Sequence, residues 1–155
     1  MSSADHFSIR RLDRSDVALM EALLTVFGEA FGDVETYSIA RPSAAYLGRL
    51  LENGPFIAIA ALKSGKVVAG LAAYELRKFE QERSEIYIYD LAVAAAHRRE
   101  GIATSLIREL QEIAAERGAY VIFVQADLID SPAIALYSKF GVREDVLHFD
   151  IPPRC

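Results

Sequence analysis

Apolar residues recur along the chain at two spacings, one typical of helices and the other of strands. Runs rich in β-branched, aromatic and other apolar residues predict strands over Phe7–Leu12, Phe56–Leu62, Val67–Leu76, Glu85–Val93, Ala119–Gln125 and Val146–Ile151. Helical spacing predicts four helices, which run from Asp13 or Ser15 to Gly32, from Pro42-Ser43 to Asn53, from Ile102 to Gly118, and from Asp130 to Gly141. The order β-α-α-β-β-β-α-β-α-β predicts an α/β (α+β) fold with a mixed central β-sheet flanked by helices.

Connections between these segments sharpen the expected topology. A short turn at residues 63–66 joins two β-type runs and predicts an antiparallel hairpin, while the polar segment 33–41 is interpreted as a connecting loop. Glu85–Val93 carries the strongest strand signal and is expected at the centre of the sheet. With the Ile102 helix and the Ala119–Gln125 strand it forms a right-handed parallel strand–helix–strand unit.

Composition narrows the class of protein. The 155 residues are 52% hydrophobic and 25% charged, without a linker, repeat or low-complexity stretch, so residues 1–155 are expected to form one globular domain. Cys155 is the only cysteine and cannot form an internal disulfide, and no Cys/His cluster suggests a metal site. A polar N-terminal stretch and apolar runs far shorter than a bilayer span predict a cytoplasmic protein outside the membrane. The net charge of -5 disfavours nucleic acid and favours a cationic partner, although acidic surfaces also serve solubility.

The connection between the strongest strand and its helix is a candidate anion site. It reads His97-Arg98-Arg99-Glu100-Gly101-Ile102-Ala103. Gly101 at the helix entry permits close approach of a ligand to free first-turn N–H groups, and two arginines add forked donors for a pyrophosphate. The loop matches neither the Gly-x-Gly-x-x-Gly of dinucleotide sites nor a Gly-Lys-Ser/Thr loop. A solvent-exposed loop without a ligand is the competing interpretation.

Three motifs in order resemble the GCN5-related N-acetyltransferase (GNAT) superfamily. Arg98, Gly101 and Ala103 match its acyl-coenzyme A loop, Gln/Arg-x-x-Gly-x-Gly/Ala, while Asp90–Val93 looks like its fourth strand and Ser131–Gly141 like its closing segment. The chain is most similar to the type I aminoglycoside 3-N-acetyltransferases, known as gentamicin acetyltransferases. The segments that carry this similarity are Phe31–Ser38, Ser84–Val93, His97–Thr104 and His148–Ile151.

The resemblance implies acetyl-CoA as cosubstrate and no metal. It places the pantetheine arm against a strand backbone and the pyrophosphate on the following loop and helix. The cofactor-binding residues expected from it are Leu91, Ala92, Val93, Arg98, Arg99, Glu100, Gly101, Ile102, Ala103 and Thr104. Backbone donors exposed by a splay or bulge after Asp90 would polarise the thioester.

Two residues are expected to move protons. Asp90 is assigned as the base, directly or through water, because Asp is rare in strands and its parity with Ile86 and Ile88 would bury a carboxylate at a cost. The alternative is an Asp that caps a bulge. Tyr137 matches the family's general acid, and a phenol with a pKa near ~10 is protonated at neutral pH. The alternative there is an aromatic packing role.

The resemblance and the acidic balance together suggest acetylation of the 3-amino group of an aminoglycoside such as gentamicin, giving antibiotic resistance. Acceptor-binding candidates are Asp33, Glu35, Tyr37, Glu80, Asp127 and Asp150. Two alternatives stay open: a GNAT enzyme acting on another amine (polyamine, peptide or protein), and a non-catalytic acyl-CoA-binding module. A homodimer is consistent with the family, with an exposed last strand available for pairing.

Overall fold

The computed structural model describes residues 6–155. Their contacts separate into two compact units, Met1–Gln125 and Ala126–Cys155. No helix in the described part of the chain is long and apolar enough to cross a membrane.

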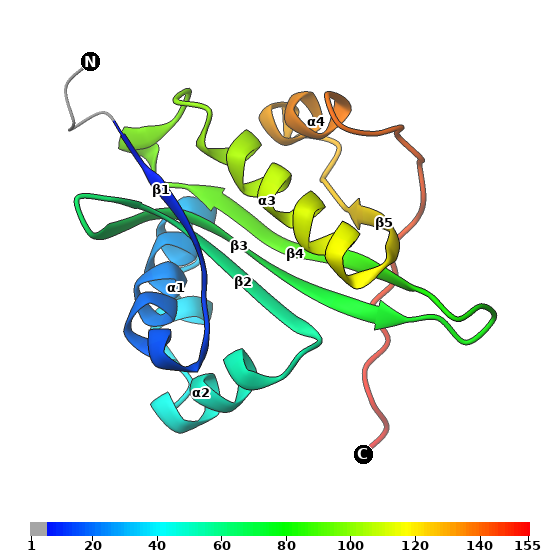
Figure 1. The fold of residues 1–155 in the computed structure, drawn as a ribbon, viewed down its shortest axis with the longest axis horizontal. Coiled ribbons are helices and arrows are strands. Elements are labelled where there is room, and N and C mark those ends of the chain that lie inside the picture. The colour runs from blue at the N-terminus through cyan, green and yellow to red at the C-terminus, as the bar shows by residue number, and fades with distance from the viewer. Residues whose placement is uncertain (1–5) are drawn as a thin grey trace. The chain divides into compact units, whose positions relative to one another are not determined.

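The first unit is built on one five-stranded sheet in the order β1-β2-β3-β4-β5 (Figure 1). Its strands are β1 (Ser8–Arg11), β2 (Phe56–Lys63), β3 (Lys66–Arg77), β4 (Ser84–Val93) and β5 (Ala119–Val124). Neighbours from β1 to β4 are antiparallel, whereas β4 and β5 are parallel. The predicted mixed sheet is therefore confirmed, with the predicted parallel pair on either side of a crossover helix.

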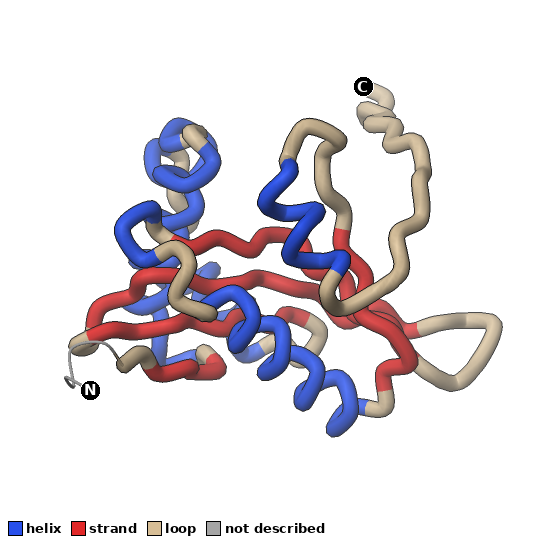
Figure 2. The backbone as a smooth tube through the Cα atoms, turned by 90° about the horizontal axis from the view of Figure 1, so that it is seen from above, coloured by secondary structure: helices blue, strands red, loops and turns tan. Residues whose placement is uncertain are grey.

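Helices cover both faces of this sheet (Figures 1 and 2). They are α1 (Val17–Phe31) and α2 (Ala44–Glu52) on one face and α3 (Ile102–Arg117) on the other. Alternate residues of β2 divide between two cores: Ile59 packs with Leu106 of α3, and Ala60 packs with Leu23 of α1 and Leu47 of α2. The period of two along each strand thus supplies an apolar surface to each helical layer.

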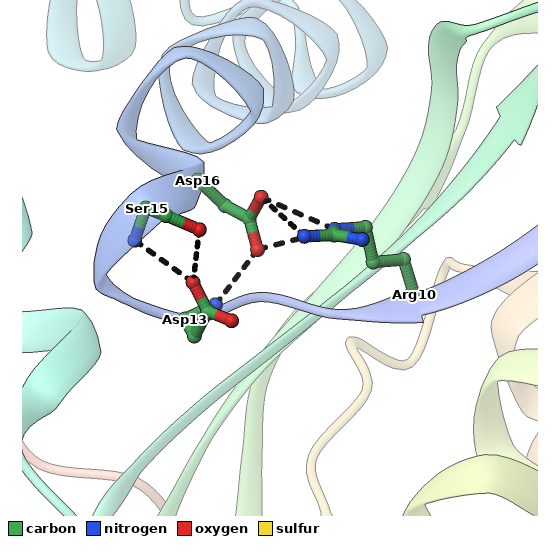
Figure 3. A network of polar contacts seen from close by, with 4 residues as sticks. All are labelled: Arg10, Asp13, Ser15 and Asp16. Atoms are coloured by element: carbon green, nitrogen blue, oxygen red, sulfur yellow. Dashed lines mark hydrogen bonds and ion pairs between the residues drawn. The ribbon is translucent and has the colours of Figure 1, made fainter.

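The entry into α1 is fixed by a small polar network (Figure 3). Asp13 caps the turn η2 (Arg14–Asp16) by accepting the N–H of Ser15 at 2.8 Å, and its own N–H donates to Asp16 Oδ2 at 2.9 Å. Arg10 of β1 donates to Asp16 from two nitrogens, at 2.8 and 3.1 Å. The side chain of Asp16 is almost fully buried, and these donors compensate for its lost hydration.

The hairpin between β2 and β3 is tighter than the sequence predicts. Both strands continue to Lys63 and Lys66, which pair with each other, so only Ser64 and Gly65 form the turn. Both have positive φ, 50° and 77°, as a two-residue turn of type I′ requires.

Residues 33–41, interpreted from sequence as a loop, contain a single π-helical turn, η3 (Glu35–Ile39). Arg41 clamps this turn to α1: its Nη2 donates to Thr25 Oγ1 at 2.8 Å, to Ser38 Oγ at 3.3 Å and to the carbonyl of Tyr37 at 3.4 Å. The sequence did not reveal this ordered turn, because its order depends on a contact with another element, the bond from Arg41 to Thr25 of α1.

The second unit contains one helix, α4 (Ser131–Ser138), which Asp130 caps by accepting the N–H of Ala133 at 3.2 Å. The predicted last strand over Val146–Ile151 is wrong, since residues 142–155 form neither helix nor strand. Its apolar side chains, among them Leu147 and Phe149, are exposed. Alternation marks a segment that is able to form a strand, but a strand also requires a neighbour to hydrogen-bond.

Candidate active site

A bulge in β4 shapes the candidate site. Ile88 pairs with Ala73 and Asp90 with Ala72 of β3, so Tyr89 is an extra residue without a partner in the register. A bulge of this kind bends its strand and redirects the side chains beside it. The sequence places the irregularity after Asp90, whereas the structure places it immediately before.

The bulge also reverses the alternation of side chains along β4. Ile86 and Ile88 lie in the core beneath α3, and Leu91, beyond the bulge, packs against that same core. Asp90 pairs with Ala72, which belongs to the core beneath α1 and α2. Asp90 therefore faces α1, and its assignment to the face of Ile86 and Ile88 is wrong because one extra residue shifts the two-residue period.

Asp90 is partly buried and has one side-chain hydrogen-bond partner among the described residues. The hydroxyl of Tyr37, in η3, donates to Asp90 Oδ2 at 2.9 Å. Burial raises the pKa of Asp90 above its ordinary value, and the hydrogen bond from Tyr37 opposes that rise. Burial, followed by the bond to Asp90, also raises the pKa of Tyr37, so the phenol stays protonated and remains a donor at neutral pH. The carboxylate is thus held as a hydrogen-bonded base of increased proton affinity.

Next to Asp90 one edge of β4 is open. Pairing between β4 and β5 ends at Ile88 and Val124, while β4 continues to Val93. Within the described residues, no ladder covers Tyr89–Val93 on the side of β5. Backbone N–H and C=O groups of this stretch are free to pair with an extended ligand, as in strand addition.

The loop that follows β4 leads directly to the start of α3. Gly101 is the N-cap, with φ of 81°, and Arg99 also has positive φ, 65°. The N–H groups of Ile102, Ala103 and Thr104 begin the helix and have no acceptor four residues back within it. Arg98 donates from Nε to the carbonyl of Val93 at 3.3 Å, which ties the loop to the end of the strand. The combination of free N–H groups and the positive end of the helix dipole suits a phosphate.

The side chain of Glu100 has a structural partner. Lys63 Nζ lies 2.8 Å from Glu100 Oε2, and this lysine is well shielded from solvent. The ion pair anchors the loop to the β2–β3 turn and directs the Glu100 carboxylate to that lysine. Any contribution of Glu100 to anion binding would therefore come from its backbone.

Taken together, these features form a base beside an open strand edge that ends in an anion-binding helix terminus. Such an arrangement holds an extended carrier with a phosphate at one end and its reactive group near Asp90. No group of three or more His, Cys, Asp or Glu side chains within residues 6–155 is arranged to hold a metal ion.

Comparison with known proteins assigns the family. The model of the acetyltransferase (GNAT) family matches residues 18–142. The chain belongs to the acetyltransferase (GNAT) family. This confirms the family predicted from the motifs, and the matched residues extend into both compact units. Members of this family transfer acetyl groups from acetyl-CoA, and the assignment of its binding residues to the open edge of β4 and the start of α3 stays a prediction.

Two solved structures are similar to this chain over nearly its whole length. An aminoglycoside acetyltransferase from an uncultured soil metagenomic sample is 66% identical, with a TM-score of 0.94, covering 96% of this chain and 99% of that one. A second aminoglycoside acetyltransferase from such a sample, crystallised with sisomicin, is 31% identical, with a TM-score of 0.87, covering 96% of this chain and 97% of that one.

Curated relatives match a shorter region. Streptothricin acetyltransferase of Streptomyces lavendulae is 34% identical over 74 residues, which are 48% of this chain and 38% of that protein. The matched region of this chain spans less than half the length of the curated relatives.

The acceptor-binding candidates are distributed unevenly. Asp33 and Glu35 lie in or beside η3, near Tyr37, and Asp33 accepts the N–H of Thr36 at 3.2 Å. Glu80 lies in the β3–β4 connection and pairs with Lys78 at 3.3 Å. Because Ser84 and Asp90 are six strand residues apart, that connection is about 20 Å from Asp90 along β4. Tyr37 therefore contacts Asp90, Asp33 and Glu35 lie in the same short segment as Tyr37, and Glu80 is far from Asp90.

Three further predicted residues belong to the second unit. Tyr137 is in the last turn of α4, where its carbonyl accepts the N–H of Phe140 and of Gly141, both at 3.0 Å. Asp127 precedes α4, and its carbonyl accepts the N–H of Asp130 at 3.0 Å. Asp150 Oδ1 lies 2.8 Å from His148 Nε2. Their roles in the acetyltransferase remain predictions.

Sequence reasoning missed one contributor to the site, Lys63, and for a second, Tyr89, left open whether it lines the site or the core. Lys63, which anchors the loop through Glu100, lies in a hairpin more than thirty residues earlier, and no local signal links the two. Tyr89 is 66% exposed beside Asp90, and its ring contacts Tyr74 and Tyr87 at 6.2 and 5.9 Å. The sequence signal for this aromatic surface is the presence of Tyr74, Tyr87 and Tyr89 in two predicted strands that are neighbours along the chain.

Proposed function

We propose that this protein transfers the acetyl group of acetyl-CoA to the 3-amino group of aminoglycosides of the gentamicin type, and that it thereby confers resistance. The observation that carries the proposal is Asp90, a hydrogen-bonded carboxylate of raised pKa, beside the open edge of β4. The high identity to a protein described as an aminoglycoside acetyltransferase supports the acceptor class. Resemblance to the type I 3-N-acetyltransferases supports the position on the acceptor.

In the proposed reaction the acetyl-CoA thioester lies along Tyr89–Val93, with its pyrophosphate on the N–H groups of the α3 start. The acceptor amine forms a bond to the acetyl carbon, the carbon–sulfur bond breaks, and the electron pair leaves on sulfur. Asp90 accepts the proton that the amine loses, and Tyr137 donates a proton to the departing thiolate. A carboxylate serves both stages, since it first pairs with the ammonium form of the acceptor and then takes its proton.

Charge and aromatic surface support a polycationic, ring-containing acceptor. The net charge is -5, and Asp33 and Glu35 are exposed beside the turn that carries Tyr37. Tyr89 and Tyr74 expose ring faces on the same side of the sheet as Asp90. Cations bind favourably over tyrosine rings and near carboxylates, and both kinds of group lie beside the proposed base.

The test is release of free thiol from acetyl-CoA in the presence of gentamicin or sisomicin, with the product analysed by NMR. We expect turnover and a single acetamide at N3, and no turnover with gentamicin already acetylated at that nitrogen. Expression in a susceptible bacterium is expected to raise the inhibitory concentration of gentamicin.

Spermine, an N-terminal peptide and a lysine peptide serve as competing acceptors. Preferential turnover of one of these would assign a different amine to the enzyme. Acetyl-CoA binding in a calorimeter without turnover of any amine would indicate a binding module and would contradict the proposal.

We also propose that the protein acts as a homodimer. The support is the row of exposed apolar side chains in the second unit, Val146, Leu147, Phe149 and Ile151. Contiguous exposed apolar residues of this kind usually mark an interface. Light scattering on a sizing column is expected to give about twice the chain mass, and replacing Leu147 and Phe149 by Ser is expected to give the monomer mass. A wild-type monomer would contradict this.

A further inference from the structure

We propose that Tyr37 is a positioning residue for Asp90: its hydroxyl orients the carboxylate, and the turn η3 together with α1 holds the hydroxyl in place. The inference rests on the proposed acetyl transfer, in which Asp90 is the base. It changes the role of Tyr37 from an acceptor contact to a support of the base.

Geometry is the first argument. Tyr37 Oη lies 2.9 Å from Asp90 Oδ2, across 53 residues of chain. A phenol that donates to one carboxylate oxygen leaves the other oxygen available to an amine and restrains rotation of the group. Because the pKa of Tyr37 is raised, its hydroxyl keeps the proton that this role requires.

Packing around the Tyr37 ring is the second argument. The ring lies against Phe27 and Phe31 of α1, with centroids 6.0 and 5.8 Å apart. Gly28 lets the turn approach α1, because a Cβ at this position would be only 3.1 Å from Tyr37 Cβ. Arg41 donates to the Tyr37 carbonyl and to Ser38. Phe27 and Phe31 therefore hold the ring, and Arg41 and the close approach at Gly28 hold the backbone that carries it. An adaptable acceptor contact would need no such support.

A few ionisable groups surround Tyr37 and Asp90. Tyr74 of β3 and Tyr87 of β4 interact electrostatically with Asp90, whereas Tyr89 of β4 and Asp33 beside η3 interact with Tyr37. Burial raises the pKa of Tyr74 and of Tyr87, so both phenols stay protonated at neutral pH. Burial has the larger effect on the pKa of Asp90, and the hydrogen bond from Tyr37 lowers that pKa, so removing the hydroxyl should raise it further.

The test is Tyr37→Phe, which keeps the ring and removes the hydroxyl. We expect kcat to fall at least about tenfold, with KM for acetyl-CoA unchanged. The acid limb of the pH profile of kcat/KM should move upward by at least about half a pH unit, because the ionised carboxylate loses a donor. Tyr120→Phe is the matched control, since its hydroxyl also donates to a carboxylate, Glu85 Oε2 at 3.0 Å, and we expect neither change there.

Gly28→Ala tests the support without touching either partner of the hydrogen bond. Alanine favours the helix, so the protein should fold, while the added Cβ displaces Tyr37. We expect the acid limb of the kcat/KM profile to move upward here too, by less than in Tyr37→Phe. Either variant with an unshifted limb and wild-type kcat would overturn the inference, even if its melting temperature fell.

Carbon-13 NMR titration of the Asp90 carboxyl in the free protein separates this inference from the proposed function. A higher Asp90 pKa in Tyr37→Phe supports the positioning role even if no aminoglycoside is acetylated. Equal Asp90 titrations in the two proteins, together with turnover of gentamicin by the wild type, would overturn the positioning role and leave the proposed function intact.

Discussion

Asp90→Asn is expected to lower kcat for acetyl transfer by a factor of about 10²–10⁴, the usual contribution of a general base. Asparagine occupies the same volume and its carbonyl still accepts the hydrogen bond of Tyr37, but it cannot take a proton from the acceptor. Binding of acetyl-CoA should be unchanged, because the proposed site holds the carrier by backbone groups of β4 and α3. Steady-state kinetics with gentamicin, combined with calorimetric titration of coenzyme A, measures both quantities.

Asp33→Asn is the matched control, since it removes the same charge from an exposed carboxylate close to Tyr37. We expect it to raise KM for the acceptor and to leave kcat within about threefold, as loss of an exposed charge contact does. Full activity of Asp90→Asn would show that another group is the base. A raised KM with unchanged kcat would make Asp90 an acceptor ligand.

Asp90→Asn should not destabilise the protein. Burial raises the pKa of Asp90 in the folded chain, so folding favours its protonated form. That favourable contribution is complete below the unfolded pKa of about 3.9 and is lost as pH rises through the folded value. At neutral pH the ionised carboxylate therefore reduces stability. Asp90→Asn should unfold at an equal or higher temperature at pH 7, and this advantage should disappear near pH 3.

The raised pKa also predicts the pH dependence of the wild type. Catalysis requires ionised Asp90, so kcat/KM should fall as pH decreases through a value above that of an ordinary aspartate. The hydrogen bond from Tyr37 limits the rise.

Sequence pattern was sufficient to predict the long elements of the first unit, because α1 and α3 are amphipathic and β2 and β3 are apolar runs buried on both faces. The strands β2 to β4 and the helices α1 and α3 lie within a few residues of their expected bounds. Local chemistry also located their ends, since Gly32 and Gly118 adopt left-handed conformations at the ends of α1 and α3. These features depend on neighbouring residues alone, and a single sequence contains them.

The irregular features were harder to predict, because each depends on contacts between distant residues. The bulge at Tyr89 arises from the register against β3, and alternation along β4 alone gave the wrong face for Asp90. The turn η3 is held by Arg41 and by packing against α1. A candidate base could thus be named from its residue type and family motif, while its orientation and partner required the fold.

The prediction of the last strand was wrong for another reason. Val146–Ile151 has the composition of a strand, but no strand is formed by residues 142–155. Strand propensity shows only that a segment is able to adopt the extended conformation. A strand forms when the segment also hydrogen-bonds to the edge of a neighbouring strand.

Gly70→Ala is expected to produce the largest loss of stability of any single methyl addition in the first unit. Gly70 lies in the middle of β3, between Ala60 and Ala92 of the neighbouring strands. A Cβ there would be 2.7 Å from the carbonyl oxygen of Ile59 and would overlap the side chain of Leu23. Leu23 is fully buried in the core beneath α1, and the Ile59 carbonyl belongs to a central strand, so neither can move freely.

Overpacking of this kind costs about 3 kcal/mol, which corresponds to about 6–12 °C in melting temperature for a chain of this size. Gly54→Ala is the control, because no heavy atom lies within 4 Å of a Cβ at that position, and it should change the melting temperature by less than about 2 °C. Equal melting temperatures for Gly70→Ala and the wild type would contradict the close approach of α1 to β3.

Combining Gly70→Ala with Leu23→Ala distinguishes the contact of the new methyl group with Leu23 from its contact with the Ile59 carbonyl. Leu23→Ala alone should cost about 2–5 kcal/mol through the cavity it creates. If the leucine is the main obstacle, the cavity accommodates the new methyl group, and the double variant is more stable than the sum of the two losses predicts. If the Ile59 carbonyl dominates, the losses add. The first outcome would show that Gly70 sets the distance of α1 from the sheet, and through Phe27 and Phe31 the position of Tyr37 against Asp90.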